Sequence, residues 1–518
     1  MQTEIKIPKI FTASIEGLEG NLVEVEADLN VGLHAFNIVG LADKSVNEAK
    51  ERVNSALKNS KIKPPTQENR RITINLAPAD TKKIGTHFDL PIALAYLLAS
   101  QQIKLFDTKN KIFVGELSLD GSLRPIKGAL NIALFAANNN FEYLFLPAGN
   151  AKEAAIVKNI KIIPILNLQQ LIDYLEQKQN IEPQKQTEIN FTNQPYFVSI
   201  SDIKGEEFAK RALLICAAGG HNLLMSGPPG TGKTMLAQSI LSILPMPEFD
   251  EIIEITKIYS VMGLLDKNHP FANFRPFRNP HHTASISSII GGGTNLRPGE
   301  ISLAHRGVLF FDELPEFHRD ILEALRQPME SGTIVVARSK NTITFPAKFI
   351  FIAAMNPCPC GYFNDPQKLC TCTPNSILKY QHKISGPLLD RIDLQIIVPR
   401  LPINELMNKQ KTSADLNLEN KYKNLVKQAR EIQKQRFKNT NIYTNSEMSS
   451  KQTDELINIT NEAKTFLQNY ANKMFLSARS YYRLLKISRT IADLEQSETV
   501  NKEHIAEAAQ YKININEN

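Results

Sequence analysis

Residues 1–175 alternate short apolar strands with amphipathic helices. Residues 21–29 and 71–76 show the two-residue alternation of half-buried strands, whereas apolar residues recur at helical spacing over 44–57. The apolar stripe of that predicted helix consists of Val46, Ala49, Val53, Ala56 and Leu57. Similar strand and helix signals follow one another up to residue 175. This order predicts an α/β domain over residues 1–175.

The pattern changes twice beyond that domain. Residues 176–195 are rich in Gln, Lys, Asn and Pro without apolar periodicity, which predicts a linker. Residues 196–400 again alternate apolar strands with helices, and residues 401–518 carry almost only helical signals. The predicted fold class is therefore α/β, with a second α/β domain over 196–400 and an all-α C-terminal part.

Composition narrows the class of protein. The chain has 518 residues, 42% hydrophobic and 22% charged, which is typical of a globular protein of several domains. The net charge of +7 is compatible with nucleic acid as a partner but does not establish one. Apolar runs are too short to span a bilayer, and the N-terminus lacks an apolar signal core. We therefore expect a cytoplasmic protein with no membrane partner.

A phosphate-binding loop follows the predicted strand 221–226 and precedes the apolar helix 235–244. Its glycines let backbone N–H groups approach phosphates, and the helix N-terminus adds a favourable dipole. Lys233 can reach the β- and γ-phosphates, and Thr234 can hold Mg²⁺. This context predicts ATP binding with Mg²⁺ over a chance glycine-rich turn. The loop residues are Gly227, Pro228, Pro229, Gly230, Thr231, Gly232, Lys233 and Thr234.

A second apolar strand, residues 308–311, runs directly into two carboxylates. Asp312 is predicted to hold Mg²⁺ through water, and Glu313 to polarise the water that attacks the γ-phosphate. The alternative is an apolar strand that runs into an ordinary acidic loop. Because this strand follows a phosphate loop in the same predicted domain, we favour ATP hydrolysis.

Five further motifs carry a resemblance to a known family. They are Pro-His-His-Thr at 280–283, the glycine-rich segment 291–300, the segment 302–314, Asn-Pro-Cys-Pro-Cys-Gly at 356–361, and the segment 385–393. Together with the phosphate loop, the chain resembles the AAA+ ATPases over nearly its whole length. Within them it is similar to the magnesium-chelatase-like branch and its ComM and YifB group. The resemblance implies a homo-hexameric ring.

The resemblance also implies roles for residues outside the phosphate loop. Asn356 matches the sensor-1 residue that orients the attacking water. Arg391 resembles an arginine finger that acts on a neighbouring subunit's ATP, and Arg479 resembles sensor 2. Lys204 and Gly205 resemble a segment that packs on adenine. For each arginine, an ordinary surface ion pair is the alternative.

Two segments resemble inserts that face the central channel of the ring. Residues 286–300 match a helix-two insert containing Arg297, and residues 333–345 match a pre-sensor-1 hairpin with Arg338 and Lys340 near its tip. Basic tips of this kind suit contact with a phosphate backbone without reading bases. We therefore predict DNA contacts for Arg297, Arg338 and Lys340. Exposed, solvated loops are the alternative.

Four of the five cysteines fall close together, in two C-x-C pairs. Cys358, Cys360, Cys370 and Cys372 could supply the four thiolates of a structural Zn²⁺ site, although C-x-C is tighter than the usual spacing. Reduced thiols and redox disulfides are the alternatives.

The N-terminal domain resembles the Lon protease domain over the segments 83–94 and 114–126. His87 occupies the position of the Lon nucleophile, and Leu130 the position of its lysine. A Ser–Lys dyad needs a hydroxyl to attack and an amine to deprotonate it. We therefore predict that this domain is not a protease.

Three functions fit these observations. The first is a hexameric DNA helicase that promotes branch migration of recombination intermediates during natural transformation, with recombination proteins as partners, as the resemblance implies. The second is a magnesium-chelatase-like ATPase that remodels partner proteins. The third is a nucleotide-gated scaffold, which the Asp312–Glu313 pair disfavours.

Overall fold

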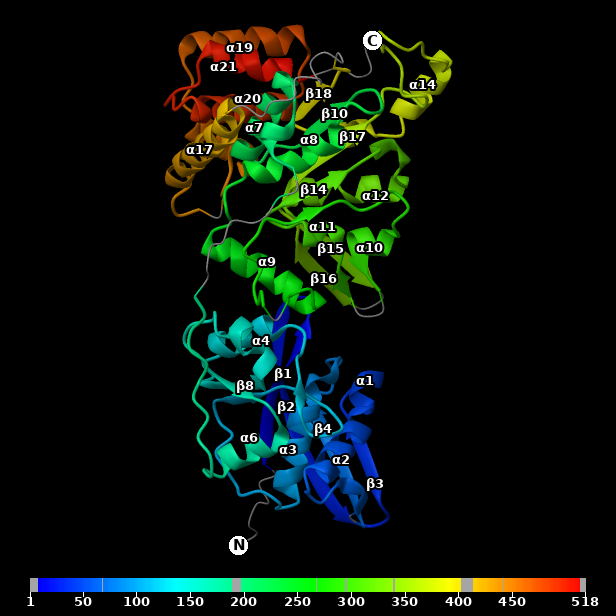
Figure 1. The fold of residues 1–518 in the computed structure, drawn as a ribbon, viewed down its shortest axis with the longest axis vertical. Helices are drawn as coiled ribbons and strands as arrows, with labels where there is room; N and C mark the ends of the chain where they lie inside the picture. The colour runs from blue at the N-terminus through cyan, green and yellow to red at the C-terminus, as the bar shows by residue number, and fades with distance from the viewer. Residues whose placement is uncertain are drawn as a thin grey trace. The chain divides into compact units, whose positions relative to one another are not determined.

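The structure is a computed structural model that describes residues 8–67, 69–188, 196, 198–266, 268–293, 296–338, 341–401, 413–440 and 442–512. The chain divides into two compact units. Unit 1 comprises residues 1–190 and 252–273, and unit 2 comprises residues 191–251 and 274–518. Figure 1 shows the course of the chain through both units.

A four-stranded sheet forms one half of unit 1, in the order β1-β2-β4-β3. Strands β1 (Lys9–Glu16), β2 (Glu19–Val31) and β4 (Arg70–Ala77) are antiparallel, and β3 (Ala35–Val39) is parallel to β4. Helices α2 (Ala49–Asn59) and α3 (Asp89–Ala99) pack together, with α3 against β1 and β2. The apolar stripe predicted for residues 44–57 is fully buried in this core, which confirms that helix face.

A parallel sheet forms the other half of unit 1. It contains β5 (Lys111–Phe113), β8 (Tyr143–Pro147) and β9 (Lys161–Ile165), accompanied by α4 (Ala129–Asn138) and α6 (Leu168–Leu175). Shorter elements complete the unit. They are α1 (Lys44–Asn47), α5 (Ala151–Ala154), β6 (Glu116–Leu117) and β7 (Leu123–Arg124).

The segment predicted as a linker lies against unit 1 as far as residue 188. The backbone N–H of Gln184 donates to the carbonyl of Ile162 at 2.8 Å, and that of Thr187 donates to Ala155 at 3.1 Å. Ile181 is buried in the core of the unit. A polar composition therefore did not prevent this stretch from being fixed by backbone hydrogen bonds.

Residues 252–273 belong to unit 1, although the sequence pattern places them in the ATPase domain. They include most of helix α9 (Phe249–Met262). The Ser260 hydroxyl donates to the buried carboxylate of Glu153, whose pKa is raised by burial, and the Ser260 carbonyl accepts from Gly128 at 3.0 Å. Local periodicity identifies a helix but not the unit against which it packs.

Unit 2 contains a five-stranded, fully parallel sheet in the order β11-β14-β17-β10-β18. Its strands are β10 (Leu223–Ser226), β11 (Phe277–Arg278), β14 (Val308–Phe311), β17 (Ile350–Met355) and β18 (Leu394–Ile397). β10, β14 and β17 are buried along their whole length, as expected for continuous apolar runs in a parallel sheet. Helices α7 (Glu207–Gly219) and α8 (Lys233–Ser239) pack on it.

Shorter elements connect these strands. They are α10 (Ile286–Ile290), β12 (Gly291–Gly292), β13 (Arg297–Pro298), α11 (Glu300–Leu303), α12 (Arg319–Ala324), α13 (Pro328–Ser331), β15 (Thr333–Arg338), β16 (Asn341–Pro346), α14 (Pro374–Gln381) and α15 (Gly386–Leu389). β12 pairs with β13 and β15 with β16, both antiparallel.

The C-terminal part of unit 2 is helical, which confirms the predicted class. It contains α17 (Ser413–Arg436), α18 (Ser450–Leu456), α19 (Asn461–Lys473), α20 (Ala478–Leu494) and α21 (Lys502–Gln510). Helices α17 and α20 pack on α7, and their buried side chains share one core with the five-stranded sheet. None of the helices in the described residues is long and apolar enough to cross a membrane.

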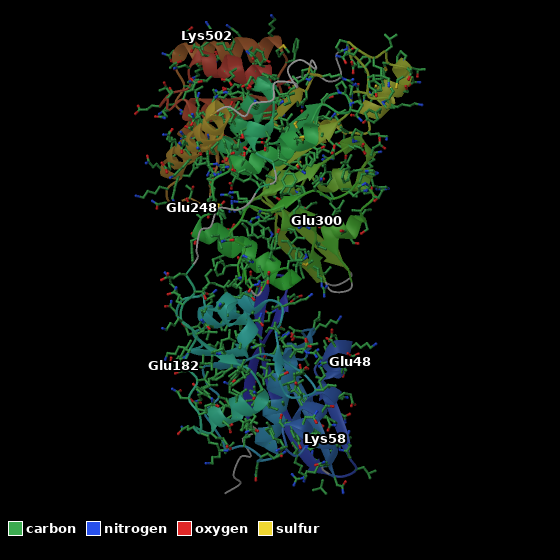
Figure 2. All side chains as sticks on the ribbon, in the orientation of Figure 1. Glu48, Lys58, Glu182, Glu248, Glu300 and Lys502 are labelled. Atoms are coloured by element: carbon green, nitrogen blue, oxygen red, sulfur yellow. The ribbon has the colours of Figure 1, made fainter. Side chains whose placement is uncertain are left out.

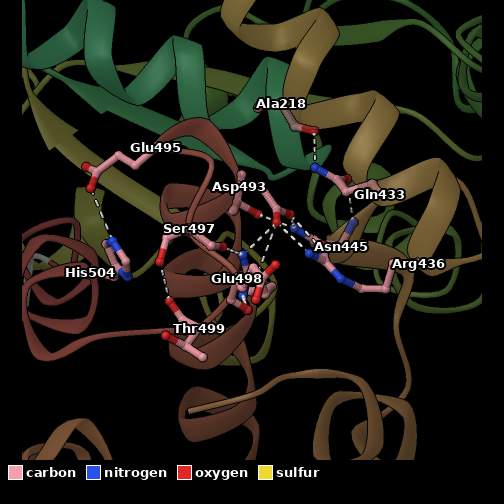
Figure 3. Close-up of polar contacts among 12 residues, drawn as sticks. Ala218, Gln433, Arg436, Asn445, Asp493, Glu495, Ser497, Glu498, Thr499 and His504 are labelled. Atoms are coloured by element: carbon pink, nitrogen blue, oxygen red, sulfur yellow. Dashed lines mark hydrogen bonds and ion pairs between the residues drawn. The ribbon is translucent and has the colours of Figure 1, made fainter. Parts of the chain in front are cut away.

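A buried polar network fixes these helices to one another (Figure 3). The Asp493 carboxylate on α20 accepts hydrogen bonds from the guanidinium groups of Arg436 and Arg489. It also accepts one from the Asn445 amide at 2.8 Å. Gln433 accepts from the backbone of Asn445 and donates to the Ala218 carbonyl on α7 at 3.1 Å. Since Asp493 is fully buried, its charge depends on these partners for compensation.

Candidate nucleotide-binding and hydrolysis site

Three neighbouring parallel strands end at the same edge of the sheet and deliver the predicted catalytic groups. β10 leads into the phosphate loop, β17 into Asn356 and β14 into Asp312. Ser226 pairs with Met355, and Phe311 with Ala353, so the three loops emerge at similar heights. A crevice at the carboxyl ends of parallel strands is where α/β folds bind ligands.

The phosphate loop has the backbone geometry that its glycines predict. Gly230 and Gly232 adopt φ of 80° and 82°, in the left-handed region that favours glycine. A Cβ atom on Gly227 would lie 2.2 Å from the Val398 carbonyl oxygen, so a side chain cannot be accommodated there. Helix α8 begins at Lys233, so its N-terminus points toward the loop that would hold the phosphates.

The Lys233 ammonium group closes the phosphate loop. It donates to the carbonyls of Gly227 at 2.7 Å and Pro228 at 2.8 Å, and approaches Asn356 Oδ1 at 3.4 Å. Burial lowers the pKa of Lys233 to about 8, against the opposing charges of Asp312 and Glu313. An ammonium held in this way is ready to exchange carbonyl oxygens for phosphate oxygens.

Oxygen ligands suited to Mg²⁺ meet between α8 and β14. The Thr234 hydroxyl donates to Asp312 Oδ2 at 2.7 Å. A hydroxyl beside a carboxylate is the hard-oxygen set that Mg²⁺ uses together with nucleotide phosphates. These two residues therefore fit the predicted metal role.

Glu313 has an unusual backbone conformation and a neighbour that sequence reasoning missed. Its φ is 53°, which is uncommon for a non-glycine residue, and its side chain is 54% exposed. His282 Nδ1 lies 3.7 Å from Glu313 Oε2, and its ring lies 4.2 Å from that of His281 at an angle of 32° and meets Phe317 edge-on. The Pro-His-His-Thr motif was the only signal in the sequence that could have indicated His282.

Arg391 lies at the opposite end of the sheet from the phosphate loop. It comes just before β18, and its carbonyl accepts from the Asn222 side chain at 3.0 Å, just before β10. β10 and β18 are parallel, with Leu223 paired to Leu394, whereas the phosphate loop follows β10. Four strand residues span about 13 Å. Arg391 and the phosphate loop of the same chain are therefore separated by the length of the sheet.

Arg479 lies beside Arg391, and one carboxylate contacts both. The Arg391 Nη2 group donates to Glu330 Oε2, and Arg479 Nη1 lies 3.7 Å from Glu330 Oε1. The hydrogen bond from Arg391 is the largest effect that lowers the pKa of Glu330, and the charge of Arg479 adds to it. We call Arg391 and Arg479 the arginine pair, and Glu330 is the carboxylate between them.

The arginine pair lines a cavity of about 800 Å³. Further cations line the same cavity, on the sheet side, on α17 and on α20. They are Arg275, Arg306, Lys348, Arg430, Arg483 and Lys486. The acidic lining residues Glu251, Glu447, Asp390 and Asp393 form ion pairs with four of these cations. Among the described residues that line the cavity, none comes from the phosphate loop or from Asp312 and Glu313. The catalytic residues predicted from the sequence thus fall into two separate groups.

Two of the predicted DNA-contacting residues, Arg297 and Arg338, lie on adjacent hairpins. Arg297 is exposed at the start of β13, and Arg338 ends β15; Lys340 lies outside the described residues. A Cβ atom on Gly292 of β12 would lie 3.9 Å from Val336 of β15, so the hairpins are neighbours. Arg278 anchors the first insert by hydrogen bonds of 2.5 and 2.7 Å to Glu300, which is labelled in Figure 2.

The segment predicted to pack on adenine comes just before α7. Lys204 is exposed, and Gly205 has a φ of 56°. The preceding turn is attached close to the end of the phosphate-loop helix, because the N–H of Ile200 donates to the Ser242 hydroxyl at 3.0 Å.

The four clustered cysteines converge on one point. Their sulfur atoms all lie within 4.8 Å of one another, and Cys358 lies 3.4 Å from Cys360 and 3.7 Å from Cys370. A tetrahedral zinc site with Zn–S bonds of about 2.3 Å places its sulfurs about 3.8 Å apart. Among the described residues, none of the four is joined in a disulfide. Their arrangement fits a zinc ion without rearrangement of the backbone.

Backbone N–H groups surround the same sulfurs. Phe363 donates to Cys358 at 3.3 Å, Cys360 donates to Cys372 at 3.4 Å, and Cys372 donates to Cys370 at 3.4 Å. A hydrogen bond from the backbone of Tyr362 lowers the pKa of Cys360 to about 5, which favours the thiolate that a metal binds, whereas burial raises the pKa of Cys358. The loop also abuts the nucleotide site, since a Cβ atom on Gly361 would lie 2.8 Å from Pro229.

The residues at the Lon-like positions are buried in unit 1. His87 Nε2 lies 3.0 Å from the Ala13 carbonyl, and burial lowers the pKa of His87 to about 4. Leu130 is fully buried on α4. A buried neutral imidazole and an aliphatic side chain supply neither the nucleophile nor the base of a Ser–Lys dyad.

Comparison with known proteins gives matches to one family along the chain. Residues 199–406 match the family described as magnesium chelatase, subunit ChlI. Residues 25–150 match subunit ChlI of Mg-chelatase, and residues 419–512 match the C-terminal part of the magnesium-chelatase subunit ChlI.

Curated relatives cover nearly the whole chain. Competence protein ComM of Haemophilus influenzae is 42% identical over 515 residues, 98% of this chain and 97% of that protein. YifB of Escherichia coli is 39% identical over 507 residues, 97% of this chain and 96% of that protein. The magnesium-chelatase 38 kDa subunit of Rhodobacter capsulatus is 26% identical over 176 residues, which is 30% of this chain and 49% of that subunit.

Proposed function

This chain belongs to the magnesium-chelatase ChlI-type family that includes competence protein ComM and YifB, and from that premise we propose that it is an ATP-driven DNA motor. In this proposal it hydrolyses ATP as a homo-hexameric ring and acts as a helicase. Its task is to promote branch migration of recombination intermediates during natural transformation, together with recombination proteins in the cytoplasm.

The observation that carries the proposal is the separation of the arginine pair from the phosphate loop. One end of the sheet holds phosphate-binding and acidic groups, and the other end holds cations with no phosphate-binding loop beside them. Each chain then lacks the cationic half of its own site. A neighbour in a ring would supply it, because the second end of one subunit can face the first end of the next.

Each residue has a defined task in this reaction. Lys233 binds the β- and γ-phosphates, while Thr234 and Asp312 hold Mg²⁺, which supplies charge neutralisation when bound. Glu313 orients and polarises the attacking water, and Asn356 holds it against the γ-phosphate. The neighbour's Arg391 and Arg479 stabilise the charge of the transition state, an effect worth roughly 10³–10⁵-fold in rate for an arginine finger.

The two adjacent hairpins are the proposed DNA-contacting elements. Basic residues on short hairpins can neutralise phosphates without reading sequence, and Arg297, Arg338 and Lys340 fill this role in the proposal. The full-length similarity to competence protein ComM supports DNA over a partner protein as the substrate. The match to the magnesium-chelatase 38 kDa subunit covers only 30% of this chain.

Zinc bound by Cys358, Cys360, Cys370 and Cys372 is the proposed structural cofactor. The sulfur spacing and the N–H donors around the sulfurs support it. We expect one zinc per chain in the purified protein and none in a Cys358→Ser, Cys372→Ser double variant, measured by elemental analysis. A Cys216→Ser variant removes the one cysteine outside the cluster and should keep its zinc. Metal-free wild-type protein would contradict the assignment.

One experiment tests the motor itself. ATPase rate is measured with and without DNA, alongside strand displacement from a synthetic three-stranded junction. We expect DNA to stimulate hydrolysis and the junction to be resolved, and Lys233→Ala to abolish both. Hydrolysis that ignores all DNA, with no junction moved, would favour a protein-remodelling ATPase instead.

A further inference from the structure

We propose that Glu330 is a positioning residue that holds Arg391 and Arg479 together as one receptor for the nucleotide phosphates of a neighbouring copy of this chain. The inference rests on the proposed ring ATPase and assigns a task to a residue that no sequence motif indicated.

The carboxylate of Glu330 divides its two oxygens between the two guanidiniums. Oε2 accepts a hydrogen bond from Arg391, and Oε1 faces Arg479 at 3.7 Å. Two guanidiniums brought together without an anion repel each other and separate. One carboxylate between them cancels that repulsion and sets their spacing.

Both sides of this contact are fixed to the fold. Glu330 belongs to α13, which is closed by a hydrogen bond from the N–H of Gly332 to the Pro328 carbonyl at 2.9 Å. Arg391 donates its Nη1 group to the Pro387 carbonyl at 2.8 Å. Since α13 and α15 are thereby held by their own backbones, the position of Glu330 determines where the guanidiniums point.

One unused donor of the arginine pair is available to an anionic partner. Within the part of the chain that the structure describes, Arg391 Nε is buried without a hydrogen-bond partner, whereas Arg483 Nη2 lies 3.8 Å from Asp390 Oδ1 in an ion pair. Buried donors are normally satisfied, so each such group needs an explanation. Phosphate oxygens accept several such hydrogen bonds at once, and guanidinium groups match their geometry.

Loss of the charge at position 330 should change the stability of the fold little. Glu330 is 56% exposed and Arg479 39%, so their ion pair contributes little to folding, and a Gln side chain at this position can still accept the hydrogen bond from Arg391, which is 12% exposed. Loss of the carboxylate should therefore leave the fold intact and change the rate of hydrolysis, which makes the inference testable.

The first test measures ATP hydrolysis by full-length Glu330→Gln. We expect kcat to fall about 10- to 100-fold, as for misplaced catalytic groups, with KM for ATP, melting temperature and ring size unchanged. Glu330→Asp keeps the charge with a shorter reach and should give an intermediate kcat. Glu248→Gln is the matched control, because Glu248 is 53% exposed and pairs only with Lys434 among the described residues (Figure 2). A kcat of Glu330→Gln at or above that of the wild type overturns the inference.

The second test locates the defect by mixing inactive subunits. Lys233→Ala mixed with Arg391→Ala should regain activity, because some interfaces then combine an intact phosphate loop with an intact arginine pair. Glu330→Gln mixed with Lys233→Ala should likewise regain activity, whereas Glu330→Gln mixed with Arg391→Ala should not. If Lys233→Ala and Arg391→Ala fail to complement, the shared site proposed above fails. If they complement but Glu330→Gln complements Arg391→Ala equally well, only the role of Glu330 is overturned.

Discussion

The two ends of the parallel sheet in unit 2 carry different chemistry. At the carboxyl ends of β10, β14 and β17, loops present backbone N–H groups, one buried lysine and two carboxylates. At the amino ends of β10 and β18, side chains from helices and loops present cations and their acidic partners around a cavity. The first end is built from loops that begin where strands stop. The second end depends on helices that come from distant parts of the chain.

This difference teaches which half of a site local sequence can specify. A phosphate loop is continuous in sequence, so its geometry follows from eight consecutive residues. The arginine pair and its bridging Glu330 come from positions 391, 479 and 330, which are far apart in sequence. Only the packing of α20 against α7 brings Arg479 into place. The predictions below separate the two ends.

The largest expected effect is at the amino ends of the strands. Arg391→Ala should lower kcat roughly 10³–10⁵-fold while KM for ATP changes little, because the phosphate loop of the same chain is untouched. Steady-state hydrolysis and equilibrium binding of a fluorescent ATP analogue measure the two separately. Arg124→Ala is a suitable control, since Arg124 is 66% exposed, pairs with Glu116 in unit 1 and does not line the arginine-pair cavity. A large loss of ATP binding in Arg391→Ala would contradict the separation of the two ends.

The next effect concerns the helix that carries Arg479. Asp493→Ala leaves the guanidiniums of Arg436 and Arg489 buried without their shared carboxylate, which should lower the free energy of unfolding by about 3–5 kcal/mol. Urea denaturation followed by circular dichroism measures it. Glu462→Ala removes an exposed pair with Lys502 and should change it by about 0–1 kcal/mol. Equal losses in both variants would show that the network in Figure 3 does not fix the helices.

The smallest effect is a pH dependence at the carboxyl ends. The pKa of Lys233 is lowered to about 8 before nucleotide binds, and phosphate favours the charged ammonium. ATP affinity should therefore be constant below pH 8 and fall by up to about tenfold per pH unit above it, until the pKa of the bound state is reached. Isothermal titration calorimetry with a non-hydrolysable ATP analogue, at about four pH values between pH 6.5 and 9.5, measures this affinity.

Lys233→Arg is the matched control for the pH series, because a guanidinium stays charged over this range. Its affinity should not decline above pH 8. A decline of the same size in both proteins would assign the pH effect to another group.

Sequence alone predicted the elements and failed on some of their partners. The apolar runs of β10, β14 and β17 and the stripe of residues 44–57 are consistent over consecutive positions, so periodicity identified them. Residues 252–273 also have a helical pattern, but they pack against residues of unit 1 that are distant in sequence. Periodicity does not reveal such long-range contacts.

The same limit applies to individual side chains. Glu330 and His282 have no motif of their own that states a chemical role, and each gains its importance from a neighbour distant in sequence. Arg479 was recognisable as a candidate, but its distance from the phosphate loop of its own chain was not. That distance follows from the register of β10 and β18, which places Arg391 at the other end of the sheet, and from Glu330, which contacts both arginines. The boundaries predicted at 175, 195 and 400 stay predictions.

In the proposed ring, the parallel register of β10 and β18 would make the rate of hydrolysis depend on the amount of protein present. A solitary chain would bind ATP but lack the cations that accelerate its hydrolysis, so the bound ATP would be hydrolysed only slowly. The rate per chain would then depend on protein concentration by mass action, rising steeply where rings form. The four residues of β10 and of β18 would thus restrict rapid hydrolysis to protein concentrations at which rings form.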